Sequence, residues 1–383
     1  MADENPFVYG EIVPAVAFVG RETELERLTT DLADGQKVFL ISPRRYGKSS
    51  LIHQAFGVLG RRRLATLELT VSSFSSYVGF LEGFTKALVA LDTTAARTRP
   101  WLRDLFGTSK PELRAEGLRD RGGFNVSFPA VRSDRDAARL ADDVFALPAR
   151  IADRLGKRVA IALDEFQAVG AYNGGSVEQA LRAAVQQQRQ VGYVFAGSEP
   201  SLMDQMIGRK RPFYKAGPVM RLGKIPPQRF AAWVDDRFKR SGLAPEQGLG
   251  AAMVDLSGNL PYDVQRLAHE TWDDVTRGRR RRATLDDLHA TLHRLLSEQD
   301  TLFEAIWQRL TLAQRAVLRA VVIEHGHEML GADTRRRHRL GGASSVQTAL
   351  AALQREDVIT REDRRRYVVI DSLMREWIAR KTY

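Results

Sequence analysis

The sequence has no cysteine among its 383 residues, which excludes disulfide bonds, thiolate metal sites and a cysteine nucleophile. It also lacks any apolar run that approaches the roughly 20 residues a membrane-spanning helix needs. The first residues, Met1 to Pro6, do not have the basic and then apolar pattern of a signal peptide. We therefore expect a cytoplasmic protein that makes no contact with a membrane.

Acidic residues are too few to balance the basic ones. The chain has 58 Lys and Arg against 47 Asp and Glu, which gives a formal net charge of +11. Such an excess favours an anionic partner, with nucleic acid first and an acidic protein or membrane surface second. The hydrophobic content of 44% is ordinary for a globular protein, and the length predicts two or three domains.

A short apolar run from Val38 to Ile41 leads through a polar loop into Gly47-Lys48-Ser49. This pattern predicts a buried strand, a phosphate-binding P-loop and the start of a helix. Backbone N–H groups of such a loop bind phosphate oxygens, and Gly47 lets the backbone approach them closely. Lys48 would place its charge on the β- and γ-phosphates, and the Ser49 hydroxyl would bind Mg²⁺.

One position departs from the usual P-loop pattern. Ser42 stands where the first glycine is expected, so a positive φ at this residue would be costly. The alternative interpretation of the whole stretch is an ordinary strand, turn and helix with a solvated lysine.

A second apolar run, Val159 to Leu163, ends in the carboxylates Asp164 and Glu165. It predicts a buried parallel strand whose acidic end lies at the ligand-binding edge of an α/β sheet. Next to a P-loop, Asp164 would hold Mg²⁺ and Glu165 would orient and deprotonate the attacking water. The alternative is a strand that ends at a helix N-cap. Ser198, after the next predicted strand, fits either a polar sensor of the γ-phosphate or a helix N-cap.

The order of helical and apolar segments predicts an α/β P-loop core with a parallel sheet, an all-helical lid and a winged-helix domain. The predicted ranges are residues 1–225 for the core, 226–305 for the lid and 306–383 for the winged helix-turn-helix. Within the core, an irregular insertion near 93–135 contains a strand or hairpin near 122–128. In the last domain, Ser344 would cap the recognition helix 344–354, and residues 358–361 and 366–370 would form a hairpin.

Arginines flank this predicted recognition helix and the tip of the hairpin, where they would contact DNA phosphates. They are Arg335, Arg336, Arg337, Arg361, Arg364, Arg365 and Arg366. A winged helix that packs on protein instead of DNA is the alternative. Two further basic segments stay open: Arg209 or Arg211 as an arginine finger or as loop charge, and Arg277 to Arg282 as an anion patch or a solvated connection.

Five segments, taken in order, carry a resemblance to a known family. They are Phe18-Val19-Gly20-Arg21-Glu22, Pro43 to Leu51, Asp164-Glu165-Phe166-Gln167, Ala196-Gly197-Ser198 and Gly258 to Tyr262. Together they resemble the archaeal-type ATPase family of the STAND/AAA+ P-loop ATPases, over nearly the whole chain. The Arg44-Arg45 pair is fairly specific to that family. Initiator ATPases of the origin-recognition type are a weaker match, because their P-loops are typically glycine-rich.

The resemblance implies a bound ATP with Mg²⁺. The implied nucleotide contacts are Phe18, Val19, Arg21, Ser42, Pro43, Arg44, Arg45, Tyr46, Gly47, Lys48, Ser49, Ser50 and Pro261. Pro261 replaces the usual sensor arginine of the lid. Ser49 and Asp164 would hold the metal, and Glu165, Lys48 and Ser198 would serve hydrolysis.

The sequence therefore favours an ATP-hydrolysing switch that acts on DNA through its winged helix, with self-assembly and a protein partner as further expectations. The alternative is a DNA- or protein-binding module stabilised by nucleotide, with little turnover. Retention of both Asp164 and Glu165 favours the switch. A metal-dependent nuclease has little support, since these two residues are the only convincing carboxylate pair.

Overall fold

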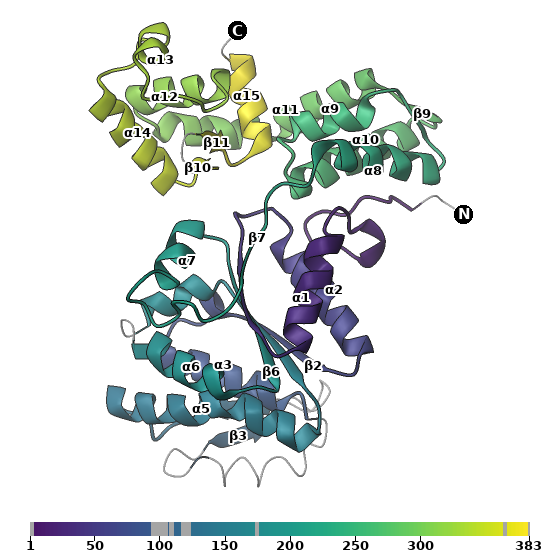
Figure 1. The fold of residues 1–383 in the computed structure, drawn as a ribbon. Helices are drawn as coiled ribbons and strands as arrows, with labels where there is room; N and C mark the ends of the chain where they lie inside the picture. Colours follow the sequence, from purple (N-terminus) through teal and green to yellow (C-terminus); the bar gives the residue numbers. More distant parts are fainter. Residues whose placement is uncertain are drawn as a thin grey trace. The chain divides into compact units, whose positions relative to one another are not determined.

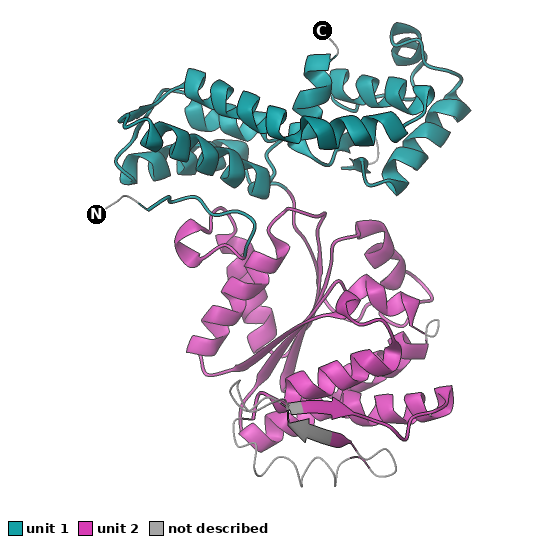
Figure 2. Cartoon of the chain, turned by 180° about the vertical axis from the view of Figure 1, so that it is seen from behind, with its two compact units in different colours: residues 1–11, 224–383 teal, residues 12–223 magenta. Residues whose placement is uncertain are grey.

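The computed structural model describes residues 4–92, 106, 111–115, 124–172, 176–362 and 366–381. The chain forms two compact units, which have different colours in Figure 2. The core unit comprises residues 12–223, and the C-terminal unit comprises residues 1–11 and 224–383.

A five-stranded parallel sheet forms the centre of the core unit (Figure 1). Its strands are β1 (Lys37–Ile41), β2 (Ala65–Thr70), β5 (Val159–Asp164), β6 (Val191–Gly197) and β7 (Val219–Arg221). They lie in the order β2-β5-β6-β1-β7, so β1 has neighbours that come later in the chain on both sides. The carboxyl ends of β1, β5 and β6 therefore meet at one edge, where ligands of such sheets bind. The predicted α/β class of the core is confirmed.

Helices cover both faces of this sheet, as Figure 1 shows. One face carries α1 (Glu22–Ala33) and α2 (Lys48–Arg61). The other carries α3 (Tyr77–Val89), α5 (Asp134–Leu155) and α6 (Ser176–Gln187). Short helices η1 (Ala15–Ala17), η2 (Val71–Ser73), η3 (Phe166–Ala171) and α7 (Pro200–Met206) lie between the longer elements.

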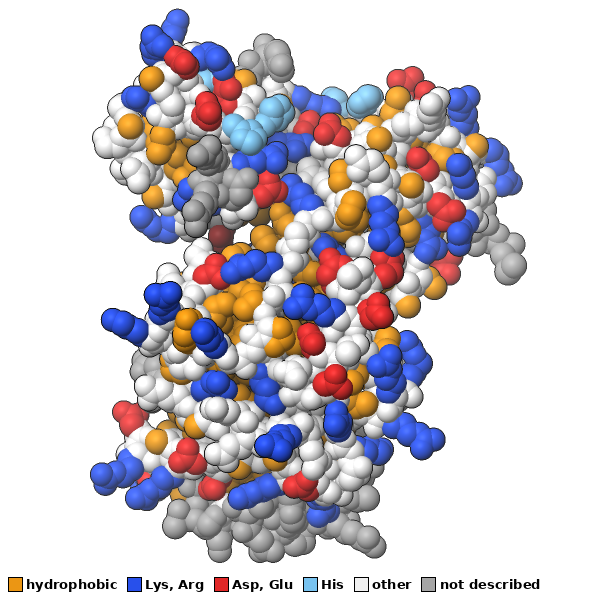
Figure 3. All heavy atoms as spheres, viewed as in Figure 1, with side chains coloured by type: hydrophobic (Ala, Val, Ile, Leu, Met, Phe, Trp, Pro, Cys, Tyr) orange, Lys and Arg blue, Asp and Glu red, His pale blue; other side chains and the backbone are white. Residues whose placement is uncertain are grey.

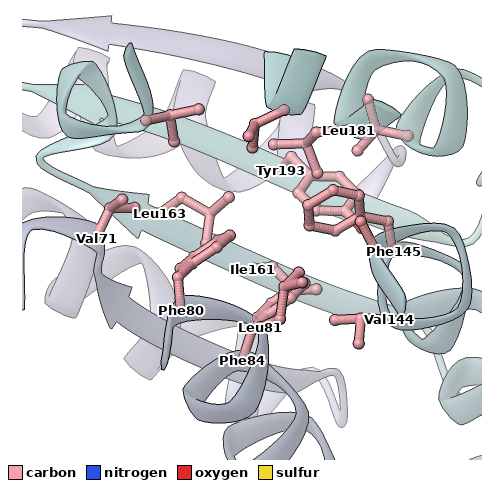
Figure 4. Close-up of a cluster of buried hydrophobic side chains, with 14 of the residues drawn as sticks. Val71, Phe80, Leu81, Phe84, Val144, Phe145, Ile161, Leu163, Leu181 and Tyr193 are labelled. Atoms are coloured by element: carbon pink, nitrogen blue, oxygen red, sulfur yellow. The ribbon is translucent and has the colours of Figure 1, made fainter. Parts of the chain in front are cut away.

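Alternating residues of the strands supply the two halves of the core. Val38 and Leu40 of β1 pack with α1 and α2, whereas Phe39 packs with the helices of the opposite face. In β5, Ile161 and Leu163 lie on this second face, where Figure 4 shows them among the side chains of α3 and α5. Because successive side chains of a strand point to opposite faces, a fully apolar strand indicates burial on both sides.

The predicted insertion contains a small two-stranded antiparallel sheet. Its strands are β3 (Glu112–Ala115) and β4 (Phe124–Ser127). The strand predicted near 122–128 is therefore confirmed, and its partner is β3. The remainder of residues 93–123 lies outside the described residues, apart from Phe106 and Pro111.

After the core unit, the chain forms four helices that we call the helical module, residues 226–309. They are α8 (Pro227–Arg240), α9 (Leu249–Leu256), α10 (Pro261–Arg277) and α11 (Leu285–Arg309). The predicted all-helical lid, residues 226–305, differs from the structure at one place, since β8 (Ala244–Pro245) and β9 (Arg282–Ala283) form a short parallel pair. Helix α11 also runs without a break through residue 305, where the sequence predicted the end of the lid.

The winged helix follows. It consists of α12 (Leu312–Ile323), α13 (Ala332–Arg337), α14 (Ala343–Arg355), β10 (Ile359–Arg361), β11 (Tyr367–Val369) and α15 (Ser372–Lys381). The predicted hairpin is confirmed, because β10 and β11 pair antiparallel. The prediction that Ser344 caps this helix is wrong. Helix α14 begins at Ala343, its N-cap is Gly342 without a side-chain hydrogen bond, and Ser344 lies in the first turn.

The first residues of the chain belong to the C-terminal unit, although the sequence placed them at the start of the core. Phe7 is buried against Phe238 of α8, and the backbone N–H of Val8 donates to Gln265 Oε1 at 3.1 Å. Tyr9 donates its hydroxyl proton to Glu270 at 2.6 Å, and burial together with this bond raises the pKa of Tyr9 to about 12. These contacts explain why a segment with no helical pattern is held on α10.

A glycine substitution tests the packing of α1 on the sheet. A Cβ on Gly192 of β6 would lie 2.3 Å from the carbonyl oxygen of Leu32, which is backbone and has little freedom to move. We expect Gly192→Ala to lower the free energy of unfolding by about 1–3 kcal/mol, measured by chemical denaturation. Gly57→Ala is the control, because a Cβ there meets only Arg61 Nη1 at 3.8 Å, and it should stabilise α2 by about 0.5–1 kcal/mol. Equal stability of the two variants would contradict this account of the packing.

Candidate nucleotide site

The P-loop connects the end of β1 to the start of α2. Gly47 is the N-cap of α2 and has φ +86°, a left-handed conformation that glycine adopts without strain. A Cβ at this position would meet nothing within 4 Å, so the loop faces open space here. Arg45 also has a positive φ, +69°. A left-handed non-glycine residue in such a loop is typical of functional sites.

Ser42 is accommodated without backbone strain. Ser42 is not among the residues with positive φ, so the backbone strain that a positive φ would cause at a serine is not present. Its backbone N–H donates to Gly197 O at 3.2 Å, and its hydroxyl donates to Pro43 O at 3.0 Å. The side chain is buried and ties the start of the loop to the end of β6.

Lys48 is the centre of a buried charge cluster. Its ammonium pairs with Asp164 Oδ1 and lies 3.5 Å from Glu165 Oε1. The Ser49 hydroxyl donates to Asp164 Oδ2 at 3.2 Å. Burial lowers the pKa of Lys48, although the charges of Glu165 and Glu68 act in the opposite direction. The predicted metal ligands Ser49 and Asp164 are thus brought together at the edge of the sheet.

Glu165 is oriented by its backbone and by two side-chain donors. It has φ +51°, and its N–H donates to Asp164 Oδ1 at 2.8 Å. Oε2 accepts hydrogen bonds from Ser198 Oγ and from Gln167 Nε2, both at 2.6 Å. Burial alone would raise the pKa of Glu165, but the bond from Ser198, the charge of Lys48 and the bond from Gln167 together lower it. Glu165 is therefore an ionised carboxylate at neutral pH, able to accept a proton.

Gln167 is a residue of this site to which the sequence assigned no role. It lies two residues after Glu165 in η3, and its Nε2 is also 3.5 Å from Glu199 Oε1. Neither hydrophobic periodicity nor the spacing of a motif identifies Gln167 in the sequence. The only available signal was its polar side chain directly after two acids at a strand end.

The segment Phe18 to Glu22 supports the P-loop through the side chain of Arg21. Arg21 is 4% exposed, and its guanidinium donates to Tyr46 O at 3.2 Å and to Gly223 O at 2.5 Å and pairs with Glu24 at 3.0 Å. All of these bonds are to protein groups. Phe18 and Val19 are half-buried, and Phe18 packs beside the cluster formed by α1, β1 and α2. A contact of Phe18 or Val19 with adenine stays a prediction.

The remaining predicted nucleotide contacts differ in their surroundings. Ser50 is buried and its Oγ accepts from Val13 N at 3.2 Å. Pro43 is half-buried and Tyr46 is buried, while Arg44 and Arg45 are exposed. Pro261 is the first residue of α10 in the C-terminal unit, so its contact with nucleotide stays a prediction.

The predicted DNA-contacting arginines lie on α13 and on the wing. Most already contact groups of the protein: Arg335 donates to Leu330 O at 3.2 Å, Arg336 pairs with Asp333, Arg337 pairs with Glu324 at 2.5 Å, and Arg366 pairs with Glu362 at 3.0 Å. Arg361 lies over the ring of Tyr367. Arg364 and Arg365 lie outside the described residues. DNA contacts by this set stay predictions.

Of the two candidate arginine fingers, Arg211 pairs with the buried carboxylate of Glu178 at 3.1 Å, and Arg209 is exposed. Within the described residues, no three His, Asp or Glu side chains gather in a way that could hold a metal by themselves. In the same part of the chain, every helix is too short or too polar to cross a membrane.

Comparison with known proteins gives matches for the winged helix and for the fold of nearly the whole chain. A family model described as a probable winged helix domain matches residues 301–380. Curated protein sequences give no match. A solved Walker-type ATPase of Pyrococcus abyssi is 16% identical, with a TM-score of 0.61 over 96% of this chain and 99% of that chain.

Two proteins of Aeropyrum pernix are also similar in structure. ORC2, solved in ADPNP and ADP complexes, is 11% identical, with a TM-score of 0.54 over 99% of this chain and 98% of that chain. ORC1, solved in complex with DNA, is 13% identical, with a TM-score of 0.51 over 97% and 96%. The resemblance to P-loop ATPases with a C-terminal winged helix is thus confirmed at the level of the fold.

Proposed function

We propose that this protein is a Mg²⁺-dependent ATPase that works as a molecular switch and acts on DNA through its winged helix. The observation that carries the proposal is the convergence of Lys48, Ser49, Asp164, Glu165 and Ser198 at the carboxyl edge of one parallel sheet. These residues come from three separate segments, and each has the chemistry that phosphoryl transfer to water requires.

The residues present fit a nucleotide with Mg²⁺. A buried ammonium without a charged partner is unfavourable, and here Lys48 is paired with Asp164. A phosphate group would be an alternative partner for Lys48, and a divalent cation would be an alternative partner for Asp164. The open space in front of Gly47 leaves the N-terminus of α2 accessible to an anion.

Ser49 and Asp164 would hold Mg²⁺, which when bound neutralises phosphate charge. Lys48 would exchange Asp164 for the β- and γ-phosphate oxygens of ATP. Arg21 would keep the P-loop in shape through its bond to the carbonyl of Tyr46. Lys48 would thus lose Asp164 and gain the phosphates when ATP binds. The ion pairs of the site would therefore depend on whether nucleotide is bound.

Glu165 would accept the proton of the attacking water. Gln167 and Ser198 both donate to Oε2, so they fix the carboxylate and leave Oε1 on the side of Lys48. A general base must be positioned to within hydrogen-bond reach of the proton that it removes. We therefore assign Gln167 to the positioning of Glu165.

The proposed action on DNA is supported by the winged helix at residues 301–380, the net charge of +11 and a structural neighbour solved with DNA. ATP would shift the population of conformations, and hydrolysis would reset it, so turnover can be slow or stimulated by a partner. Self-assembly and a protein partner belong to the same proposal. The second candidate, a nucleotide-stabilised DNA- or protein-binding module with little turnover, predicts no use for the ordered Glu165.

Replacement of the proposed base gives the first prediction. Glu165→Gln keeps the shape of the side chain but cannot accept a proton. We expect ATP binding to persist and the rate of phosphate release to fall by at least about 100-fold. The measurement is ATP hydrolysis and equilibrium ATP binding of the full chain, with and without Mg²⁺ and duplex DNA.

Glu26→Gln is the matched control, since Glu26 is an exposed residue of α1 in the same unit. It should hydrolyse ATP at the wild-type rate. If wild-type protein binds ATP but does not hydrolyse it under any of these conditions, the module without turnover is the correct function.

A second prediction concerns Gln167. Gln167→Met preserves the volume of the side chain but removes the hydrogen bond to Glu165. We expect kcat to fall roughly tenfold, equivalent to about 1.4 kcal/mol, with the Kd for ATP unchanged. Gln190→Met is the control, because Gln190 donates to Asp153 at an exposed position of the same unit. A wild-type kcat in Gln167→Met, or an equal loss in both variants, would contradict the positioning role.

A further inference from the structure

The connection between α10 and α11 carries an unusual run of positive charge. We call residues 277–282 the arginine loop. It has the sequence Arg-Gly-Arg-Arg-Arg-Arg, and all six residues are exposed. Residues 277–287 contain five arginines against two aspartates, a local excess of three positive charges. Like charges at this density repel one another, so a bound anion would stabilise the arginine loop.

The backbone of the arginine loop is fixed. Arg279 has φ +54°, and its N–H donates to Thr276 O at 2.9 Å. The N–H of Arg280 donates to Val275 O at 3.1 Å, and Arg281 O accepts from Ala244 N at 2.8 Å. The pairing of β8 with β9 continues this attachment. The arginines therefore extend from a defined backbone.

The side chains divide into two groups. Arg277 pairs with Asp273 at 3.0 Å, and Arg280 pairs with Asp287. By contrast, Arg279, Arg281 and Arg282 have no carboxylate partner in the described part of the chain. This distinguishes them from Arg336, Arg337 and Arg366 of the winged helix, each of which is paired.

The surroundings favour a polyanion. Helix α8 has Arg237, Lys239 and Arg240 in its last turn, and residues 241–243 connect it to β8, which pairs with β9. Arg240 pairs with Asp236 at 2.8 Å and Arg237 lies over the ring of Trp233, so Lys239 adds most to the charge here. Figure 3 shows Lys and Arg side chains gathered at the end of the helical module that carries β9. The exposed large hydrophobic residues of the described chain include none between residues 220 and 301. An apolar centre, which protein interfaces and membrane-surface helices need, is therefore missing here.

We propose that the arginine loop is a DNA contact separate from the winged helix, with Arg279, Arg281 and Arg282 on backbone phosphates. The contact is independent of base sequence, because guanidinium groups on phosphates position a protein without reading bases. The winged helix and the arginine loop belong to the same C-terminal unit, so one chain would hold DNA through two separate surfaces. The inference rests on the proposed action on DNA.

The test is the salt dependence of duplex DNA binding by the full chain. The variant replaces Arg279, Arg281 and Arg282 by Gln. We expect its affinity to fall at least tenfold at low salt, and the slope of log K against log salt to shrink by up to about 0.9 for each lost phosphate contact. Replacement of the same three residues by Lys should restore most of the slope.

A control removes the same charge elsewhere. Arg61, Arg62 and Arg63 form an exposed run at the far end of α2 in the core unit. Their replacement by Gln should leave the slope near that of the wild type. An equal loss in both Gln variants would show an effect of net charge alone and overturn the inference.

The remaining outcomes are also decisive. Wild-type DNA binding with an unchanged slope in the arginine-loop variant would refute this contact and leave the action on DNA intact. No DNA binding by the wild type would refute both. The thermal midpoint of each variant shows whether it is folded. Because the arginine loop lies in a different unit from the P-loop, ATP turnover without DNA should stay at the wild-type rate.

Discussion

The buried pair between Lys48 and Asp164 is the interaction on which this structure depends. It joins the start of α2, the helix that follows β1, to the end of β5. In the sheet, β6 lies between β1 and β5. Loss of one partner from a buried pair is strongly destabilising, by about 3–5 kcal/mol, because the other charge is left uncompensated. A site built in this way is stable only when each charge has a partner, and an anion with its cation can replace both.

The elements of the core that were predicted correctly have strong local signals. Val38 to Ile41 and Val159 to Leu163 are short, wholly apolar and followed by the loops in which we predicted phosphate and Mg²⁺ ligands. The convergence of Ser49 with Asp164 follows from parallel strands sharing an edge, so it was predictable once the strands were placed. The effect of Ser42 was not, because the φ of a loop residue depends on the hydrogen bonds of its neighbours, here the bond to Gly197.

Features without a sequence pattern were missed, whether their contacts are local or between distant segments. Gln167 contacts Glu165 within the turn after β5, two residues further along the chain, and this turn has no sequence signature. Residues 5–9 have no periodic pattern, and their place on α8 and α10 results from the side chains of Phe7, which packs on α8, and Tyr9, which bonds to α10. The β8–β9 pair is two residues long on each side, too short to stand out from helical surroundings, yet it fixes the arginine loop.

The account is tested most directly by a crystal structure of the protein with Mg²⁺ and a non-hydrolysable ATP analogue. It predicts that Lys48 leaves Asp164 for phosphate oxygens, while Ser49 and Asp164 turn towards the metal and Glu165 keeps its bonds to Gln167 and Ser198. A structure in which Lys48 still pairs with Asp164, and the nucleotide is absent or bound elsewhere, would contradict it.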